Sequence, residues 1–180
     1  MTDDELHAVT GLYERYAGPV HRYALRRSDR ETADEVVAQV FMVAWRRRSA
    51  LPEDALPWLY GVARRALAEQ RRGTARRRRL VERLRRDAVE ATPAPALLDE
   101  GLAAALRQLS QGDREALLLR YWEELEPAQI AQVMGCSRAT MAVRLHRARL
   151  RLVRELDAVS DQPEEDQQHD DSCVTETEPV

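Results

Sequence analysis

The sequence predicts an all-α protein of two small helical domains joined by a short linker, with a disordered acidic C-terminal tail. The composition is 44% hydrophobic and 33% charged but only 5% aromatic, which favours amphipathic helices over a β-sandwich or an α/β sheet. Apolar residues recur three or four positions apart through most of the chain. One Pro/Ala-rich stretch, Ala91–Ala96, separates these periodic segments, and we expect the linker there.

Helical spacing begins at residues 5–27, where Gly18-Pro19 interrupts it, so we expect two helices joined by a tight bend. Residues 31–48 carry a broad apolar stripe with helical spacing, and three arginines stand in the last turn of this expected helix. Asp54 is placed to cap a short turn, and Pro57 suits the first turn of a helix that continues toward Gln70. Beyond Gly73 an arginine-rich segment predicts a further helix.

The second half predicts a compact unit of four helices at residues 97–109, 114–124, 127–134 and 137–156. From residue 160 the chain is acidic and without apolar periodicity, which predicts disorder. The expected division is therefore a domain at 1–90, a linker at 91–97, a domain at 98–158 and a tail at 159–180.

Charge is distributed unevenly along the chain. Residues 1–90 hold 19 arginines against 14 acidic residues, residues 91–158 hold 9 of each, and residues 159–180 hold 8 acidic residues and no arginine. A basic front half points to a polyanionic partner. One hypothesis is that the acidic tail folds back on this half and suppresses binding of free DNA, and the alternative is a merely solubilising tail.

A helix-turn-helix is the sharpest local signal, and it lies between Pro127 and Leu145. Ile130 and its apolar neighbours give the first helix a buried face, Gly135 suits a left-handed residue that ends it, and Ser137 is placed to cap the second helix. A second helix with an arginine-rich open face fits the major groove of DNA. An ordinary helical hairpin with a solvated basic face is the less favoured interpretation.

A second basic segment carries aromatic residues beside it. Arg64, Arg65, Arg71 and Arg72 follow Trp58 and Tyr60. Arginines neutralise phosphates, and aromatic rings stack on unpaired bases, so this combination suits opened DNA strands. Composition alone favours equally the alternative that the aromatic residues are core and the arginines a solvated face.

Both halves together resemble a group IV, or extracytoplasmic-function, sigma factor over about residues 10–156. The front half resembles sigma region two at Leu12–Tyr16, Ala33–Arg46 and Pro57–Arg65. The back half resembles sigma region four at Glu115–Trp122 and Thr140–Arg149. Two ordered motifs separated by a linker are far more specific than either one.

The resemblance implies core RNA polymerase and promoter DNA as partners and assigns three sets of residues. The set that docks on polymerase or supports the docking helix is Glu35, Gln39, Phe41 and Trp45. The set near the minus-10 element is Trp58, Tyr60, Arg64, Arg65, Glu69, Arg71 and Arg72. The set that recognises the minus-35 element is Arg138, Thr140, Val143, Arg144, His146 and Arg147.

Three positions depart from the family pattern. Ala38-Gln39 stands where Gln followed by an acidic residue is usual, Arg65 stands where asparagine often reads a flipped base, and Ala142 replaces a usual basic residue. The fold and class survive these changes, but the promoter sequence does not follow from the resemblance.

Other function classes fit less well. A stand-alone helix-turn-helix regulator is the main alternative, and a helical adaptor would leave the basic second helix without a purpose. No P-loop, GxSxG or HExxH motif occurs, so we expect no enzyme, and Cys136 and Cys173 lack the neighbours of a zinc site, so we expect no metal or cofactor. Without an apolar run long enough to cross a membrane or a signal peptide, the expected location is the cytoplasm. An anti-sigma factor is a further partner that the resemblance allows.

Overall fold

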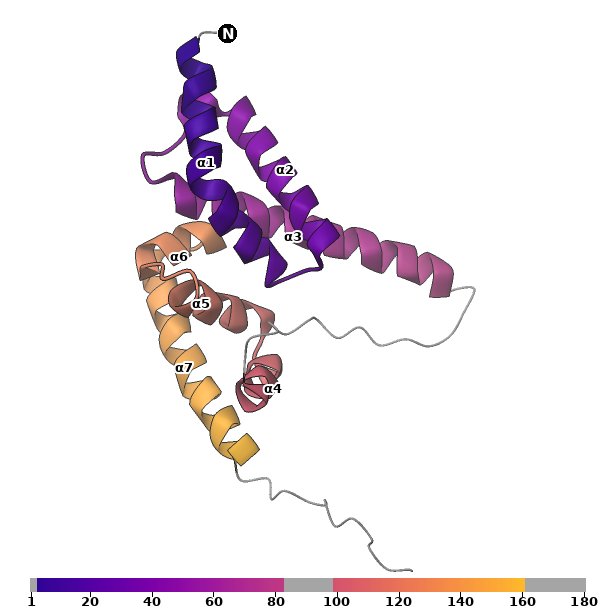
Figure 1. The fold of residues 1–180 in the computed structure, drawn as a ribbon. Coiled ribbons are helices and arrows are strands. Elements are labelled where there is room, and N and C mark those ends of the chain that lie inside the picture. The colour runs from indigo at the N-terminus through magenta and orange to yellow at the C-terminus, as the bar shows by residue number, and fades with distance from the viewer. Residues whose placement is uncertain (1–2, 83–98, 161–180) are drawn as a thin grey trace, which may run out of the picture.

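The computed structural model describes residues 3–82 and 99–160, and every regular element in these ranges is helical (Figure 1). The expected linker at 91–97 and the tail beyond residue 160 lie outside the described residues. The elements in chain order are α1 (Asp3–Leu25), α2 (Arg30–Arg46), the short 3-10 helix η1 (Arg48–Ala50), α3 (Ala55–Glu82), α4 (Glu100–Gln108), α5 (Gln111–Tyr121), α6 (Pro127–Met134) and α7 (Arg138–Ser160). The all-α fold class is confirmed.

The N-terminal bundle consists of α1, α2 and α3, which pack against one another. Asp29 caps α2, because its carboxylate accepts a hydrogen bond of 2.8 Å from the backbone N–H of Thr32. Val36, Val40 and Ala44 then lie four apart on one face of α2 and are fully buried. This face fixes α2 across α1 and α3.

Two expected helix breaks are wrong. α1 continues through Gly18-Pro19, and α3 continues through Gly73 as one helix of 28 residues. A proline in a helix removes one backbone hydrogen bond, and a glycine weakens the helix by about 1 kcal/mol, so packing on a buried face can outweigh either effect. Pro19 is followed directly by Val20 and then by Tyr23, both fully buried, and they anchor the second half of α1.

The C-terminal bundle consists of α4, α5, α6 and α7, with α7 in contact with the other three. Ser110 caps α5, which therefore begins three residues earlier than expected. Arg114 fastens α4 to α5, since its guanidinium donates to the backbone carbonyls of Leu106, Arg107 and Leu109 at the C-terminal end of α4. Partial burial lowers the pKa of Arg114, and Arg71 and Arg107 nearby lower it further.

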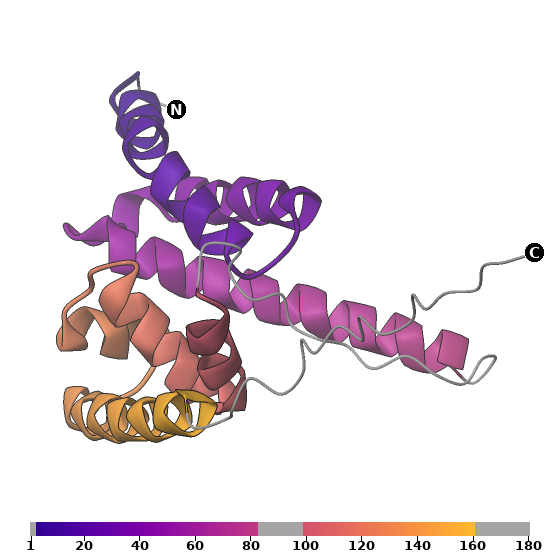
Figure 2. The same cartoon turned by 60° about the horizontal axis from the view of Figure 1, so that its bottom comes forward.

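The two bundles pack directly on each other. Helix α6 lies against α3, and buried apolar side chains form one cluster that runs through both bundles (Figures 1 and 2). The backbones approach closely here, because a Cβ added at buried Gly61 of α3 would lie 3.8 Å from Cα of Val133 in α6. The two bundles therefore share one apolar core in the described residues.

Candidate nucleic-acid interface

Helices α6 and α7 form the expected helix-turn-helix. Gly135 ends α6 in the left-handed conformation at φ 68° and ψ 40°. The N–H of Cys136 donates to the carbonyl of Ala131 at 3.0 Å, which closes the turn. Ser137 accepts a hydrogen bond of 3.1 Å from the N–H of Thr140 and so caps α7. Local sequence signals at each of these positions predicted this geometry.

The open face of α7 carries the residues expected to read the minus-35 element. Arg138, Thr140, Val143, His146 and Arg147 are exposed, and Arg144 is half-buried. Thr140 is partly engaged already, because its hydroxyl lies 2.8 Å from that of Ser137. The face is concave and basic, and a cavity of about 640 Å³ separates α7 from the start of α5. The cavity is lined by Ser110, Asp113, Ala139, Thr140, Val143, Arg144, Arg147 and Arg151.

Residues expected near the minus-10 element divide between two hollows of α3. Trp58, Arg65 and Glu69 line a cavity of about 400 Å³ between α2 and α3, together with Gln39 from the set expected to dock on polymerase. Arg64, Arg65, Arg71 and Arg72 line a second cavity of about 320 Å³. We call this second hollow the arginine cleft; its remaining lining residues are Tyr23, Arg27, Leu67, Ala68, Gln111, Gly112 and Glu115.

Tyr60, the remaining aromatic residue of the minus-10 set, does not lie at an open surface in this structure. Only 3% of the residue is exposed, its ring stacks on Tyr23 with centroids 4.8 Å apart, and its hydroxyl donates to Glu123 at 3.3 Å. Burial, together with the charge of Glu123, raises the pKa of Tyr60. Tyr60 is a core residue in this structure, because the C-terminal bundle covers the end of α3 that carries it.

The set expected to dock on polymerase lies along α2. Glu35 and Gln39 are exposed, whereas Phe41 is buried beneath them with its edge against the ring of Tyr13, 4.8 Å between centroids. Trp45 is half-buried near the end of the helix, where the guanidinium of Arg48 lies 5.3 Å from its ring. Glu35 also accepts a hydrogen bond of 2.7 Å from Gln70, which ties α2 to α3. The expected division into surface polar groups and supporting aromatic residues matches this arrangement.

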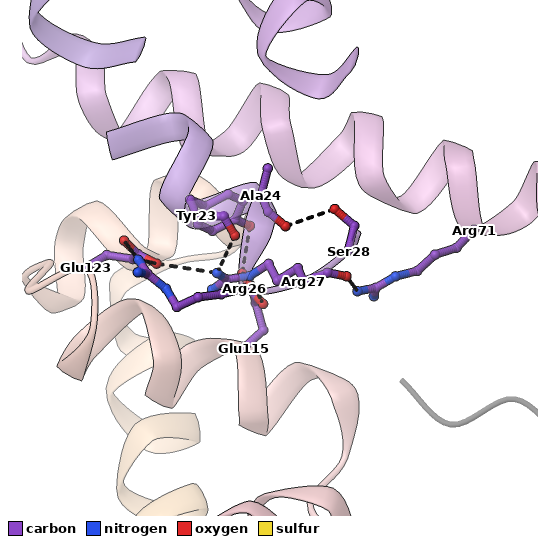
Figure 3. Close-up of polar contacts among 8 residues, drawn as sticks. All are labelled: Tyr23, Ala24, Arg26, Arg27, Ser28, Arg71, Glu115 and Glu123. Carbon is purple, nitrogen blue, oxygen red and sulfur yellow. Dashed lines mark hydrogen bonds and ion pairs between the residues drawn. The ribbon is translucent and has the colours of Figure 1, made fainter. Parts of the chain in front are cut away.

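A polar cluster between the bundles was not predicted from the sequence. Tyr23 near the end of α1 and Arg26 and Arg27 directly after that helix meet Glu115 of α5 and Glu123 just beyond α5 (Figure 3). Glu123 is followed by a second acidic residue, Glu124, as in a solvated acidic run, yet its side chain is only 3% exposed. These pairs lie more than 85 residues apart in sequence, so no local pattern reports them.

Each charge in this cluster has a partner. Both carboxylate oxygens of Glu123 accept from Nη2 of Arg26 at 2.6 Å, and Glu115 accepts from Nε of Arg27 at 2.9 Å and from the Tyr23 hydroxyl at 2.7 Å. Burial opposes the charge on Arg27, but Tyr23, Glu115 and Glu123 prevail and raise its pKa. Burial and then Glu115 raise the pKa of Tyr23. Tyr23 therefore stays neutral and Arg27 stays charged near neutral pH.

Within residues 3–82 and 99–160, no group of three His, Cys, Asp or Glu side chains is placed to hold a metal ion. Over the same part of the chain, none of the helices has the length and apolar character needed to cross a membrane.

Comparison with known proteins defines the class. Residues 12–78 match the family Sigma-70 region 2, and residues 99–152 match the family Sigma-70, region 4. Bartonella quintana RpoE, solved in complex with the anti-sigma factor NepR, superposes with a TM-score of 0.63 at 24% identity over 82% of this chain and 96% of that chain. CnrH, solved with the cytosolic domain of CnrY, gives a TM-score of 0.57 at 22% identity over 85% and 90%. The fold is that of a two-domain sigma factor.

Sequence relatives give the particular family. The ECF RNA polymerase sigma factor SigL of Mycobacterium tuberculosis is 33% identical over 153 residues, which are 80% of this chain and 86% of the relative. SigM of Bacillus subtilis, another ECF sigma factor, is 29% identical over 158 residues, 84% of this chain and 93% of the relative. This chain belongs to the ECF sigma factors, non-enzymatic proteins that direct transcription initiation with RNA polymerase.

Proposed function

We propose that α2 docks this chain on core RNA polymerase, that α3 engages the opened minus-10 element, and that α7 reads the minus-35 element in the major groove. The observation that carries the proposal is the open, basic face of α7 beyond a capped helix-turn-helix. Residues 1–90 and 98–158 then act as the two functional domains, in the cytoplasm.

Roles within each surface follow from exposure. Arg138 and Arg147 are exposed and suited to base edges or phosphates, whereas half-buried Arg144 suits phosphate contacts beside them. Trp58 and Arg65 share one hollow with Glu69, so an unstacked base there would meet an aromatic ring, a cation and a carboxylate. Tyr60 contributes only after the bundles separate, because Glu123 and the C-terminal bundle cover it.

Regulation by a further protein is part of the proposal. Two proteins of similar fold were solved with a partner, the anti-sigma factor NepR in one case and the cytosolic domain of CnrY in the other, which supports an anti-sigma factor as a partner of this chain. The acidic tail remains a second candidate regulator through its net charge of −8.

Run-off transcription with purified core polymerase on sheared DNA of the source genome tests the proposal. We expect discrete new transcripts that vanish with Trp45→Ala and with Arg147→Ala. Arg154→Ala is the matched control for the second variant, since Arg154 is exposed on α7 outside the minus-35 set and donates to the carbonyl of Leu150 in its own helix. Duplex binding without polymerase-dependent initiation would instead establish the stand-alone regulator.

A further inference from the structure

We propose that Gly112 is a positioning residue for binding of the minus-35 element, because the absence of a side chain there leaves the space in which the guanidinium of Arg144 lies. Gly112 is in the first turn of α5, and Arg144 is half-buried on α7. The phosphate contact of Arg144 rests on the proposed function of α7. The place of its guanidinium against Gly112 is a feature of the structure itself.

The contact between these two residues is close enough to exclude a side chain. A Cβ added to Gly112 would lie 2.8 Å from Nη1 of Arg144 and 3.6 Å from its Cζ. Apart from its own helix and its chain neighbours, that carbon would meet no other atom of the described residues within 4 Å. A side chain at position 112 would therefore collide first with the guanidinium of Arg144.

Space, and not backbone conformation, explains a glycine at this position. Ser110 caps α5 by accepting a hydrogen bond of 3.2 Å from the N–H of Asp113, which makes Gly112 the second residue of the helix. The φ of Gly112 is not positive, unlike that of Gly135. Glycine is less favourable than alanine in a helix, so the backbone alone gives no reason for it.

The next residue of α5 holds a second arginine of α7. Buried Asp113 pairs with Arg151, which lies two helical turns beyond Arg144 and therefore on the same face of α7. Within the part of the chain that the structure describes, no carboxylate forms an ion pair with Arg144. The start of α5 thus fixes Arg151 through charge and Arg144 through the space above Gly112.

This place leaves the donors of Arg144 available to a further group. The first N–H groups of a helix are themselves donors, so the start of α5 offers a guanidinium little to which it could donate. Arg144 lines the cavity of about 640 Å³ together with exposed Thr140 and Arg147. Two guanidinium groups beside one open cavity suit the phosphates of a duplex that α7 binds.

Displacement of Arg144 should weaken DNA binding while the fold stays intact. Nη1 is the far end of a long side chain with many rotamers, so a side chain at position 112 moves the guanidinium and leaves the helices in place. One lost phosphate contact lowers the slope of log K against log salt by about 0.9. A merely structural role of Gly112 would leave this slope unchanged.

The test is a titration of the full-length protein with a fluorescent duplex of random sequence at several salt concentrations, since phosphate contacts do not depend on sequence. We expect Gly112→Val to lower the affinity about fivefold and the slope by about 0.9, and Gly112→Ala to have a smaller effect in the same direction. Gly11→Val is the matched control, because Gly11 is exposed on α1 and a Cβ added there meets no atom within 4 Å. This control should bind as the parent does.

A double-mutant cycle shows whether Gly112 acts through Arg144. We expect Arg144→Ala to weaken binding at least as much as Gly112→Val, and Gly112→Val to cause no further loss in the Arg144→Ala background. Parental affinity of Gly112→Val, or an equal loss in both backgrounds, would overturn the proposal. Urea unfolding checks that each variant is folded, and Gly112→Ala replaces Gly112→Val in the cycle if the valine variant is not.

Nuclear magnetic resonance tests the placement of Arg144 without DNA. The Nε–H signal of Arg144, assigned by its loss in Arg144→Ala, should shift in Gly112→Val and keep its position in Gly11→Val. An unshifted signal in Gly112→Val would overturn the positioning role.

Failure of the proposed function gives a different pattern of results. A parent that binds the duplex without polymerase-dependent transcripts would refute the role of this chain in initiation, while the titrations would still decide the role of Gly112. Parental affinity of Arg144→Ala would refute the phosphate contact, and the positioning role of Gly112 would fall with it.

Discussion

Replacement of Gly135 by alanine isolates the energetic cost of the turn that positions α7. Gly135 has φ 68°, and a Cβ built there meets no atom within 4 Å. The substitution therefore adds no steric clash with the rest of the protein, and the expected loss is the backbone strain of an L-residue in the left-handed region, about 1–2 kcal/mol. For a chain of this size, that corresponds to a fall in Tm of about 2–8 °C.

Gly73→Ala is the matched control. It makes the same chemical change within α3, again with no atom within 4 Å of the added Cβ, but at a helical position without positive φ. Alanine is favoured over glycine there by about 0.5–1 kcal/mol, so Gly73→Ala should raise the free energy of unfolding.

Urea unfolding followed by circular dichroism gives both values, and Gly135→Asn should lose less stability than Gly135→Ala, because asparagine tolerates this region. At 25 °C the folded fraction of Gly135→Ala should bind duplex DNA as the parent does, since the hydrogen bonds of the turn remain possible. Equal stability of Gly135→Ala and the parent would refute the strain argument. A loss well above 3 kcal/mol would contradict an effect confined to backbone strain.

Four further predictions concern caps, strain and charge. Ser137→Ala should lower stability by about 1 kcal/mol in urea unfolding, because α7 loses its cap. Glu124→Asn should raise it, since Glu124 has a positive φ of 54° and asparagine is less strained there. Arg147→Ala should weaken duplex binding and reduce the slope of log K against log salt by about 1 if Arg147 contacts a phosphate, and an unchanged slope would remove that assignment. The hydrogen bond that Asp29 accepts from Thr32 lowers the pKa of Asp29. The parent should therefore lose stability relative to Asp29→Asn as the pH falls below about 4, and parallel curves of stability against pH for the two proteins would contradict this.

Local signals in the sequence predicted the helix-turn-helix well. Gly135, Ser137 and the buried apolar face of α6 each act within a few residues, so the sequence and the structure agree there. The all-α class and most helix positions follow from apolar periodicity for the same reason. Gly18-Pro19 and Gly73 misled the prediction, because the packing of distant side chains outweighs a local helix-breaking preference.

The candidate site was predictable only in part. Exposure of the α7 face follows from helical spacing, but the surroundings of Tyr60 and Glu123 depend on how the two bundles pack together. The sequence presents Tyr60 as a base-stacking residue beside arginines, but in the structure its hydroxyl bonds to Glu123 of the other bundle and both side chains are buried. Contacts between residues 63 positions apart depend on how two domains dock, which a single sequence does not report.

Because Glu123 is buried, dissolved salt weakens the contacts of arginines with DNA phosphates and the contact of Arg26 with Glu123 to different extents. Mobile ions screen exposed charges strongly and buried pairs much less, so electrolyte weakens the attraction of α3 and α7 for phosphates far more than it weakens the pairing of Arg26 with Glu123. A rise in ionic strength therefore weakens the binding of nucleic acid without separating the two bundles. In a cell under osmotic stress, the free protein would dissociate from DNA while its two bundles stay packed together.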